Sequence, residues 1–157
     1  MRIPGFGDRE IHTLVSDYTG TLCYHGELVN GVKERLIQLS ERLDIHIVSA
    51  DTGATAKKHL SDLPLTLYII KGKHEDAEKR EYVDSFAQEH VIAFGNGGND
   101  RLMLQSVKNN RGLAVCVDTG EGCAVDTLLH AHLLIHGATN ALDLLLETDR
   151  LVATLRF

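Results

Sequence analysis

The chain is organised around the segment His12-Thr-Leu-Val-Ser-Asp-Tyr-Thr-Gly-Thr-Leu22, in which an apolar, β-branched run leads to Asp17 and stops at Thr19-Gly20-Thr21. The run predicts a strand that ends at Asp17, with its carboxylate facing solvent. In open α/β sheets, ligands bind beyond the carboxyl ends of the strands, and a glycine there permits a sharp turn. The alternative is an aspartate that only caps a turn, which is common for this side chain.

Short apolar runs recur along the chain and alternate with segments of helical periodicity. Further strands are predicted at 45–48, 65–70, 91–94, 113–117 and 132–135. Helices are expected at 32–43, with Asn30 as the cap, and at 54–60, 76–88, 102–107 and 142–155. Residues 1–8 are expected to lie irregularly on the surface, and 23–30 to form a short polar turn. This alternation predicts a three-layer α/β/α sandwich with a mainly parallel, Rossmann-like sheet.

Length and composition restrict the class of protein. A chain of 157 residues suffices for one ordinary core, so residues 1–157 are expected to form a single domain. The net charge of -6, without a basic stripe, argues against nucleic acid as a partner. No apolar run reaches the roughly 18 to 20 residues that cross a bilayer. The three cysteines form no CxxC pair and follow no signal peptide, which predicts a soluble, cytoplasmic protein with reduced thiols.

Polar residues follow the predicted strands at their carboxyl ends. Asp17, Ser49 and Asn96 stand at or just after a strand, Asp100 follows Asn96 closely, and Lys79 lies near the start of a helix. Because parallel strands end at the same edge of a sheet, these side chains are expected to converge. Taken singly, each has a plainer interpretation, Lys79 as a lysine on a solvated helix face and Ser49 as a helix cap.

Four motifs carry these residues, and together they resemble a known family. They are Asp-Tyr-Thr-Gly-Thr-Leu (17–22), Val-Ser-Ala-Asp-Thr (48–52), Lys-Arg-Glu-Tyr-Val (79–83) and Gly-Asn-Gly-Gly-Asn-Asp (95–100). In order and separation they resemble the motifs of the haloacid dehalogenase superfamily. Within it, they are most similar to the phosphorylation domain of P-type ATPases, marked by Asp-Lys-Thr-Gly-Thr and Gly-Asp-Gly-x-Asn-Asp. Without membrane helices or a nucleotide-binding insertion, the chain looks like the soluble, P-type-ATPase-like phosphatases.

The resemblance implies a phosphohydrolase that depends on Mg²⁺. Asp17 matches the nucleophile that forms an aspartyl phosphate, which replaces one difficult displacement by two easier ones. Two anions must then approach each other, and a divalent cation bound by oxygens allows this. Asp17, the backbone carbonyl of Thr19 and Asn96 match the metal ligands, with Asp100 close behind.

The remaining catalytic roles implied by the resemblance belong to two side chains. Lys79 matches the cation that holds Asp17 and offsets phosphate charge. Ser49 matches the hydroxyl that donates to a phosphoryl oxygen.

Two departures from the family pattern predict a slow enzyme. Many phosphatases of the superfamily carry a second Asp two residues after the nucleophile as general acid and base, whereas this chain has Thr19. Losing such assistance costs typically about 10² to 10⁴ in rate. Asn96 replaces an aspartate and removes a negative charge from the metal site. The competing reading is a non-catalytic or regulatory module that binds phosphate and metal, as a partner of another protein.

The spaces where the superfamily inserts cap domains are short here. Only 23–30 and 53–78 are available, and core elements occupy them, so no cap is expected. An open site suits a phosphorylated small molecule or a phosphorylated macromolecule, or a neighbouring subunit of a homo-oligomer that acts as a lid. The apolar segment 142–146 could supply that subunit contact, although such a stripe is more often core.

A zinc site made of His130, His132, His136 and Cys123 is a weaker alternative. Their spacing matches no usual ligand pattern, so separate structural roles are favoured.

Overall fold

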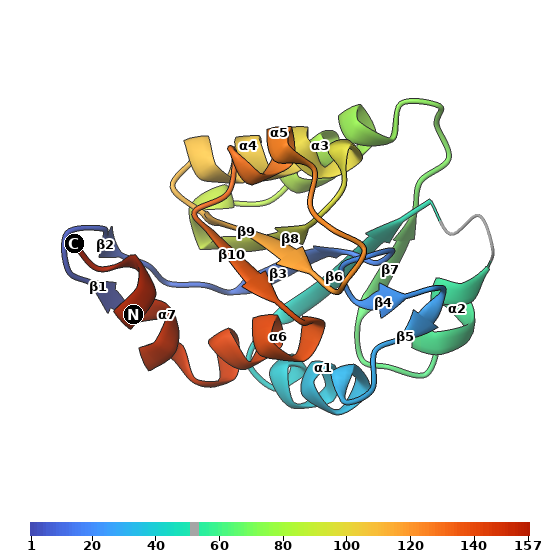
Figure 1. Ribbon diagram of the computed structural model, residues 1–157, viewed down its shortest axis with the longest axis horizontal. Helices are drawn as coiled ribbons and strands as arrows, with labels where there is room; N and C mark the ends of the chain where they lie inside the picture. Colours follow the sequence, from blue (N-terminus) through green and yellow to red (C-terminus); the bar gives the residue numbers. More distant parts are fainter. Residues whose placement is uncertain (51–53) are drawn as a thin grey trace.

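The computed structural model describes residues 1–50 and 54–157. In this part of the chain, six parallel strands form a central sheet in the order β10-β9-β8-β3-β6-β7 (Figure 1). The strands are β3 (Thr13–Asp17), β6 (Asp44–Ser49), β7 (Thr66–Ile69), β8 (Val91–Gly95), β9 (Leu113–Asp118) and β10 (Leu133–His136). The chain runs from β3 outward to β6 and β7, and then returns to β8 on the other side of β3. This reversal creates a topological switch point between β3 and β8, where α/β proteins bind ligands.

The central strand β3 is buried along its whole length, including its polar residues Thr13, Ser16 and Asp17. Leu14 faces one core cluster and Val15 the other, because successive side chains of a strand point to opposite faces. Leu14 aligns with Ile45 of β6 and Ile92 of β8. The sheet therefore needs a helical layer on each face, as the sequence predicts.

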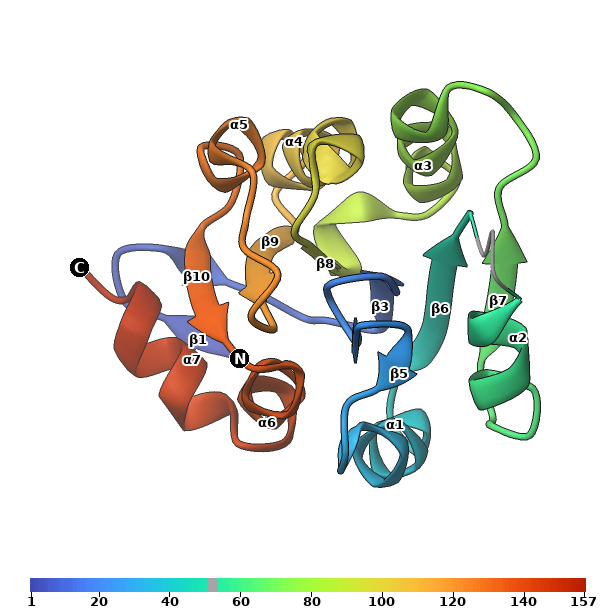
Figure 2. The same ribbon diagram turned by 45° about the vertical axis from the view of Figure 1, so that its right-hand side comes forward.

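Helices supply both layers (Figure 2). One face is covered by α1 (Val32–Ser40), α6 (Ala138–Leu146) and α7 (Thr148–Leu155), and the other by α3 (Glu75–Asp84), α4 (Arg101–Asn109) and α5 (Val125–Leu128). The short helix α2 (Thr55–Leu60) packs Ala56 and Leu60 into the same cluster as α1. Two 3-10 turns, η1 (Gln88–His90) and η2 (Gly98–Asp100), precede and follow β8. No helix in the described residues combines the length and apolarity needed to span a membrane.

Two segments are more ordered than the sequence indicates. Residues 1–8 form a hairpin of β1 (Arg2–Ile3) and β2 (Gly7–Asp8) rather than an irregular surface segment, because Ile3 is fully buried in the core cluster beneath α7. The expected polar turn at 23–30 contains a second hairpin, β4 (Cys23–Tyr24) and β5 (Glu27–Leu28). Each of these strands has only two residues, which is too short for an alternation of apolar and polar residues to be recognised in the sequence.

Helix ends also differ from the expectations. The expected single helix at 142–155 is two helices, because Glu147 leaves the helical conformation at φ -120° and ψ 72°. The N-cap position of α1 is Gly31 and not Asn30. The helix predicted at 76–88 ends at Asp84, before η1.

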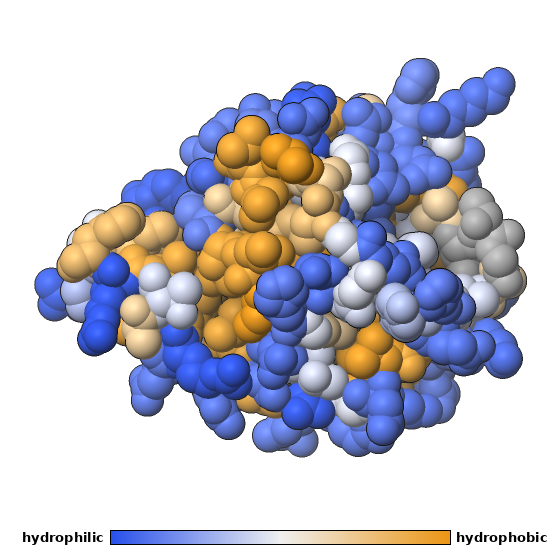
Figure 3. All heavy atoms as spheres, viewed as in Figure 1, coloured by the Kyte–Doolittle hydropathy of each residue, from blue (hydrophilic) through white to orange (hydrophobic). Residues whose placement is uncertain are grey.

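The space-filling view shows apolar side chains gathered over α5 and β10 (Figure 3). Val125, Leu129 and Leu134 are the exposed members, whereas most of the segment 142–146 is buried core rather than surface.

Candidate active site

The carboxyl ends of β3 and β8 bring together Asp17, Lys79 and Asp100. Lys79 Nζ, from α3, lies 2.6 Å from Asp17 Oδ1 and 2.6 Å from Asp100 Oδ1. The exposed fraction is 5% for Asp17, 1% for Lys79 and 0% for Asp100. The prediction that Asp17 faces solvent is therefore wrong. Its strand is central, and the following turn folds back over it through bonds from Leu22 and Cys23 N–H to the Tyr18 carbonyl.

Burial shapes the charge state of this triad. Loss of water, aided by the nearby Asp100, raises the pKa of Asp17 to about 6 against the opposing effect of Lys79. Burial by itself lowers the pKa of Lys79, but Asp17 and Asp100 outweigh it and raise that pKa overall. At neutral pH, the site therefore holds an ionised nucleophile candidate against a charged ammonium.

The second oxygen of Asp100 shapes the motif around it. Asp100 Oδ2 accepts the backbone N–H of Asn96 at 2.9 Å and of Gly97 at 3.0 Å. A side chain at Gly95 would meet the Asp100 side chain at 2.5 Å, so the glycine is required by close approach. Asp100 thus anchors both Lys79 and the loop that carries Asn96.

Thr21 belongs to the site, although the sequence gives it no role beyond its place in the first motif. Its side chain is fully buried. Thr21 Oγ1 lies 3.0 Å from Asp17 Oδ2 and 3.2 Å from Asn96 Oδ1. The Thr21 hydroxyl has one proton, so it cannot donate fully to both Asp17 Oδ2 and Asn96 Oδ1. These two oxygens therefore lie close together and share a single donor.

This oxygen pair fits a hard divalent cation, because Mg²⁺ takes a few protein oxygens and completes its shell with water or phosphate. In the described residues no group of three His, Cys, Asp or Glu side chains gathers to hold a metal. The candidate site therefore depends on mixed donors: the Asp17 carboxylate, the Asn96 amide oxygen and a backbone carbonyl. Thr19, whose carbonyl is the expected third ligand, lies exposed in the turn after β3.

Ser49 ends β6 one residue beyond Val48, which aligns with Asp17, and Ser49 is buried. The structure therefore brings Ser49 to the same edge as the other motifs. Asp51 and Thr52 of the second motif lie outside the described residues.

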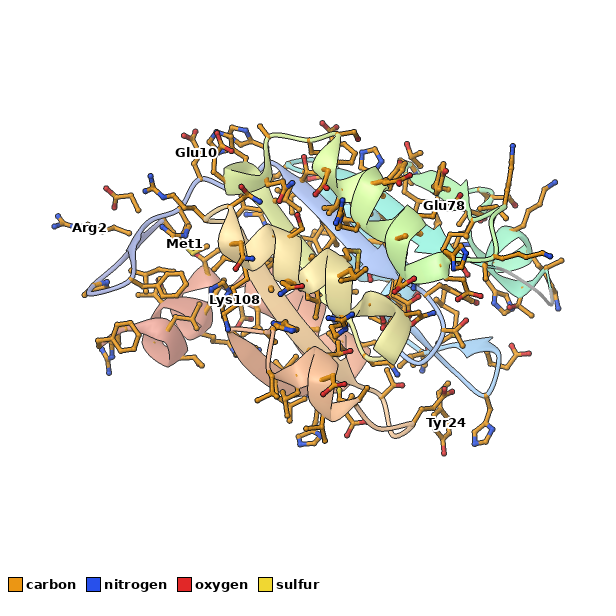
Figure 4. All side chains as sticks on the ribbon, turned by 90° about the horizontal axis from the view of Figure 1, so that it is seen from above. Met1, Arg2, Glu10, Tyr24, Glu78 and Lys108 are labelled. Atoms are coloured by element: carbon orange, nitrogen blue, oxygen red, sulfur yellow. The ribbon has the colours of Figure 1, made fainter. Side chains whose placement is uncertain are left out.

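One carboxylate of α3 holds the loop at the carboxyl end of β7. Glu78 of α3 accepts the N–H of Lys71 and Gly72, at 3.1 and 2.8 Å, and thereby holds the loop that follows β7. Tyr24 of the β4–β5 hairpin lies at the same end of the molecule as Glu78, opposite the N-terminal hairpin (Figure 4).

Two histidines of the zinc alternative have separate contacts. His132 Nδ1 accepts the Ala114 N–H at 3.1 Å, and His136 Nδ1 lies 3.1 Å from Asp118 Oδ2. The segment Gly120-Glu-Gly122 is a turn whose Gly120 and Gly122 N–H groups bond to Asp118.

Sequence comparison relates the chain to archaeal proteins. No protein-family model matches it. One uncharacterised protein of Methanocaldococcus jannaschii is 42% identical over 66 residues, covering 42% of this chain and 67% of that protein. A second from the same organism is 49% identical over 40 residues, covering 26% of this chain and 91% of that protein.

Structure comparison shows where the fold recurs. The cobalt-bound deoxy-D-mannose-octulosonate 8-phosphate phosphatase of Haemophilus influenzae has a TM-score of 0.67 at 12% identity, covering 93% of this chain and 90% of that one. The corresponding Moraxella catarrhalis enzyme, in complex with magnesium, phosphate and a KDO molecule, has a TM-score of 0.65 at 16% identity, covering 93% and 94%. A Legionella pneumophila protein described as a HAD superfamily hydrolase has a TM-score of 0.69 at 17% identity, covering 92% and 87%. The predicted α/β/α fold is thereby confirmed.

Proposed function

We propose that this chain, which belongs to one family with the two archaeal proteins and has the fold of the haloacid dehalogenase superfamily, is a magnesium-dependent phosphohydrolase acting through an aspartyl phosphate at Asp17. The structural neighbours share the fold of that superfamily, which supports the expected relationship. We further propose that residues 1–157 form one core domain without a cap, and that three free thiols reflect a cytoplasmic location.

The observation that carries the proposal is the double contact of Lys79 with Asp17 and Asp100 at the switch point. Held beside an ammonium, the Asp17 carboxylate is an ionised nucleophile that needs no base. Its oxygen forms a bond to phosphorus while the ester P–O bond breaks, and water then cleaves the aspartyl phosphate. Lys79 offsets the negative charge that gathers on the phosphoryl group, and Ser49 donates a hydrogen bond to one of its oxygens.

Asp17, the Thr19 carbonyl and Asn96 would hold Mg²⁺, with Asp100 close behind. The bound ion would reduce the repulsion between the carboxylate and the phosphate. Two neighbours contain cobalt or magnesium, which supports a divalent metal in this fold.

The substrate is a phosphate monoester that reaches an open site. The described chain between β3 and β6 adds only the β4–β5 hairpin and α1, so a small phosphorylated molecule or a phosphorylated macromolecule can approach. Two neighbours are phosphatases of an octulosonate 8-phosphate, which favours a small molecule. A second copy in a homo-oligomer could cover the opening.

A second candidate is a regulatory module that binds phosphate and metal without turnover. Thr19, where many phosphatases carry the general acid, and Asn96, a neutral ligand, favour it. The two candidates differ in whether phosphate is released repeatedly.

The experiment is a phosphomonoester screen with and without Mg²⁺, followed by rapid-quench kinetics on an active donor. A burst equal to the enzyme concentration followed by slow turnover is expected, because Thr19 provides no base for hydrolysis of the aspartyl phosphate. Asp17→Asn should abolish both phases, since the amide cannot attack phosphorus.

Turnover in a folded Asp17→Asn protein, or activity that survives EDTA, contradicts the mechanism. Binding of phosphate or beryllium fluoride without release of phosphate from any monoester would instead establish the regulatory module.

A further inference from the structure

A turn outside the four motifs contacts the metal-ligand candidate Asn96. It comprises residues 118–122 at the end of β9, and we name it the Asp118 turn. Asp118 Oδ1 accepts the N–H of Gly120 at 2.8 Å and of Gly122 at 2.9 Å, while Oδ2 contacts His136 Nδ1. These backbone bonds also hold the pKa of Asp118 below its ordinary value, so the carboxylate that closes the turn stays charged.

The closed turn presents the Gly122 carbonyl to Asn96. Asn96 Nδ2 donates to that carbonyl at 3.1 Å, and the Ala124 N–H donates to the Asn96 carbonyl at 2.8 Å. Because an amide nitrogen only donates, this bond fixes which end of the Asn96 side chain faces the turn. Oδ1 is consequently directed to the Thr21 hydroxyl, which also contacts Asp17.

The Asp118 turn also contacts the loop that carries the nucleophile. Thr119 Oγ1 donates to the Gly20 carbonyl at 2.7 Å. The hairpin packs on the same turn, since the His25 N–H donates to Glu121 Oε1 at 2.9 Å. The Asp118 carboxylate therefore organises a turn that contacts both Asn96 and the Gly20 carbonyl in the turn after Asp17.

We propose that Asp118 is a positioning residue for the metal site: it closes the turn whose Gly122 carbonyl holds the Asn96 amide with its oxygen toward Asp17. That Asn96 binds metal rests on the proposed function, whereas the orientation of its amide does not. The arrangement also accounts for an amide at this position. Asn96→Asp would place a carboxylate oxygen against the Gly122 carbonyl at hydrogen-bond distance, so the gained charge would be opposed by repulsion.

Asp118→Ala and Asp118→Asn test the proposal. The alanine variant loses the acceptor that closes the turn, whereas asparagine retains Oδ1 and rescues it. Asp118→Glu is the second disruptive variant, because it keeps the charge but moves the carboxylate one methylene away. Asp143→Ala is the matched control, since the Asp143 side chain is equally exposed, at 21%, and is bonded to Arg35 on the other face of the sheet.

The first readout needs no metal. In a ¹⁵N-edited NMR spectrum of the EDTA-treated chain, the Asn96 side-chain amide is assigned by its loss in Asn96→Asp. We expect its signals to move toward solvent-exposed positions in Asp118→Ala and Asp118→Glu, and to stay in Asp118→Asn and Asp143→Ala. The second readout is Mg²⁺ affinity by titration calorimetry, which should fall about 10-fold or more in the two disruptive variants, as for other residues that orient metal ligands.

Unchanged Asn96 amide signals in folded Asp118→Ala and Asp118→Glu would overturn the positioning role. An equal loss of affinity in Asp143→Ala would also overturn it, because a general loss of stability would then explain the result. Failure of the wild-type chain to bind Mg²⁺ would count against the proposed function, and the amide signals would still decide the role of Asp118.

Discussion

At the residue scale, the site buries two carboxylates against one ammonium, so its charges affect stability as well as chemistry. Lys79 holds both Asp17 and Asp100 within 2.6 Å. Removing the ammonium leaves two like charges without their partner in a dry environment, whereas removing one carboxylate leaves a complete ion pair. Only the loss of the ammonium should therefore lower the free energy of unfolding.

We predict that Lys79→Met lowers the free energy of unfolding by about 3 to 5 kcal/mol, the usual cost of stripping a buried charge of its partner. Asp17→Asn, measured in EDTA, should leave it unchanged or raise it, as is common when a functional residue is replaced. Urea unfolding followed by circular dichroism measures both.

Lys33→Met is the control for that comparison, because Lys33 pairs with Asp62 on the surface and such pairs contribute little. If Lys79→Met unfolds at the same urea concentration as Lys33→Met, the triad is not a stabilising unit.

The convergence of several site residues could be predicted from the sequence. Asp17 and Ser49 end strands and Asn96 follows one, and the parallel topology brings such positions to one edge of the sheet. Thr21 could not be assigned in this way, because its contacts depend on how tightly the turn folds back. Asp118 is separated from Asn96 by 22 positions and by α4, so only the register of β8 and β9 reveals its link to the site.

At the element scale, the strands were predictable and the short hairpins were not. Strands buried on both faces tend to have continuous apolar sequence, and this signal is strong in β8 and β9. The β4–β5 hairpin has a His25-Gly26 turn, which lacks the usual Asn-Gly or Asp-Gly signal. The break at Glu147 is equally hidden, because the residues around it continue a helical apolar pattern.

The turn after β3 has a testable requirement for glycine. Gly20 has φ +75°, and a Cβ there would lie 2.5 Å from Asn96 Nδ2. Gly26 has nearly the same backbone, φ +79°, with nothing near a Cβ. Gly20→Ala and Gly26→Ala should each lose about 1 kcal/mol of stability from backbone strain.

Only Gly20→Ala should weaken Mg²⁺ binding, because only its methyl group displaces the Asn96 side chain. Thermal unfolding and titration calorimetry on both variants measure the two effects separately. Equal Mg²⁺ affinity in both variants would show that Asn96 tolerates the displacement or is not a ligand.

At the scale of the whole molecule, the candidate site and the N-terminal hairpin lie at opposite ends (Figure 4). His132 belongs to the end with the N-terminal hairpin, where its ring packs edge-on against Phe6 at 5.0 Å and its Nδ1 accepts the Ala114 N–H. This histidine therefore links residues 1–8 to the start of β9 and to the segment before β10. Its protonation should change the stability of the fold without involving the metal site.

The pH dependence of stability follows from that environment. Burial, with Lys108 and Arg9 nearby, lowers the pKa of His132 from 6.5 to about 4. Between these two values the unfolded chain binds a proton that the folded chain excludes, so stability rises with pH across this window and is lost as pH falls. Because His132 is only partly buried, the loss of unfolding free energy from pH 7 to pH 4 should be on the order of 1 to 2 kcal/mol after allowance for solvent screening.

His132→Asn keeps an acceptor for the Ala114 N–H but cannot titrate, so its unfolding free energy should lack this component. His130→Asn, two residues earlier, serves as the control and should follow the wild-type pH profile. Urea unfolding of the three proteins in EDTA across this range decides the matter: a His132→Asn profile parallel to that of wild type would show that His132 is not the source of the pH sensitivity.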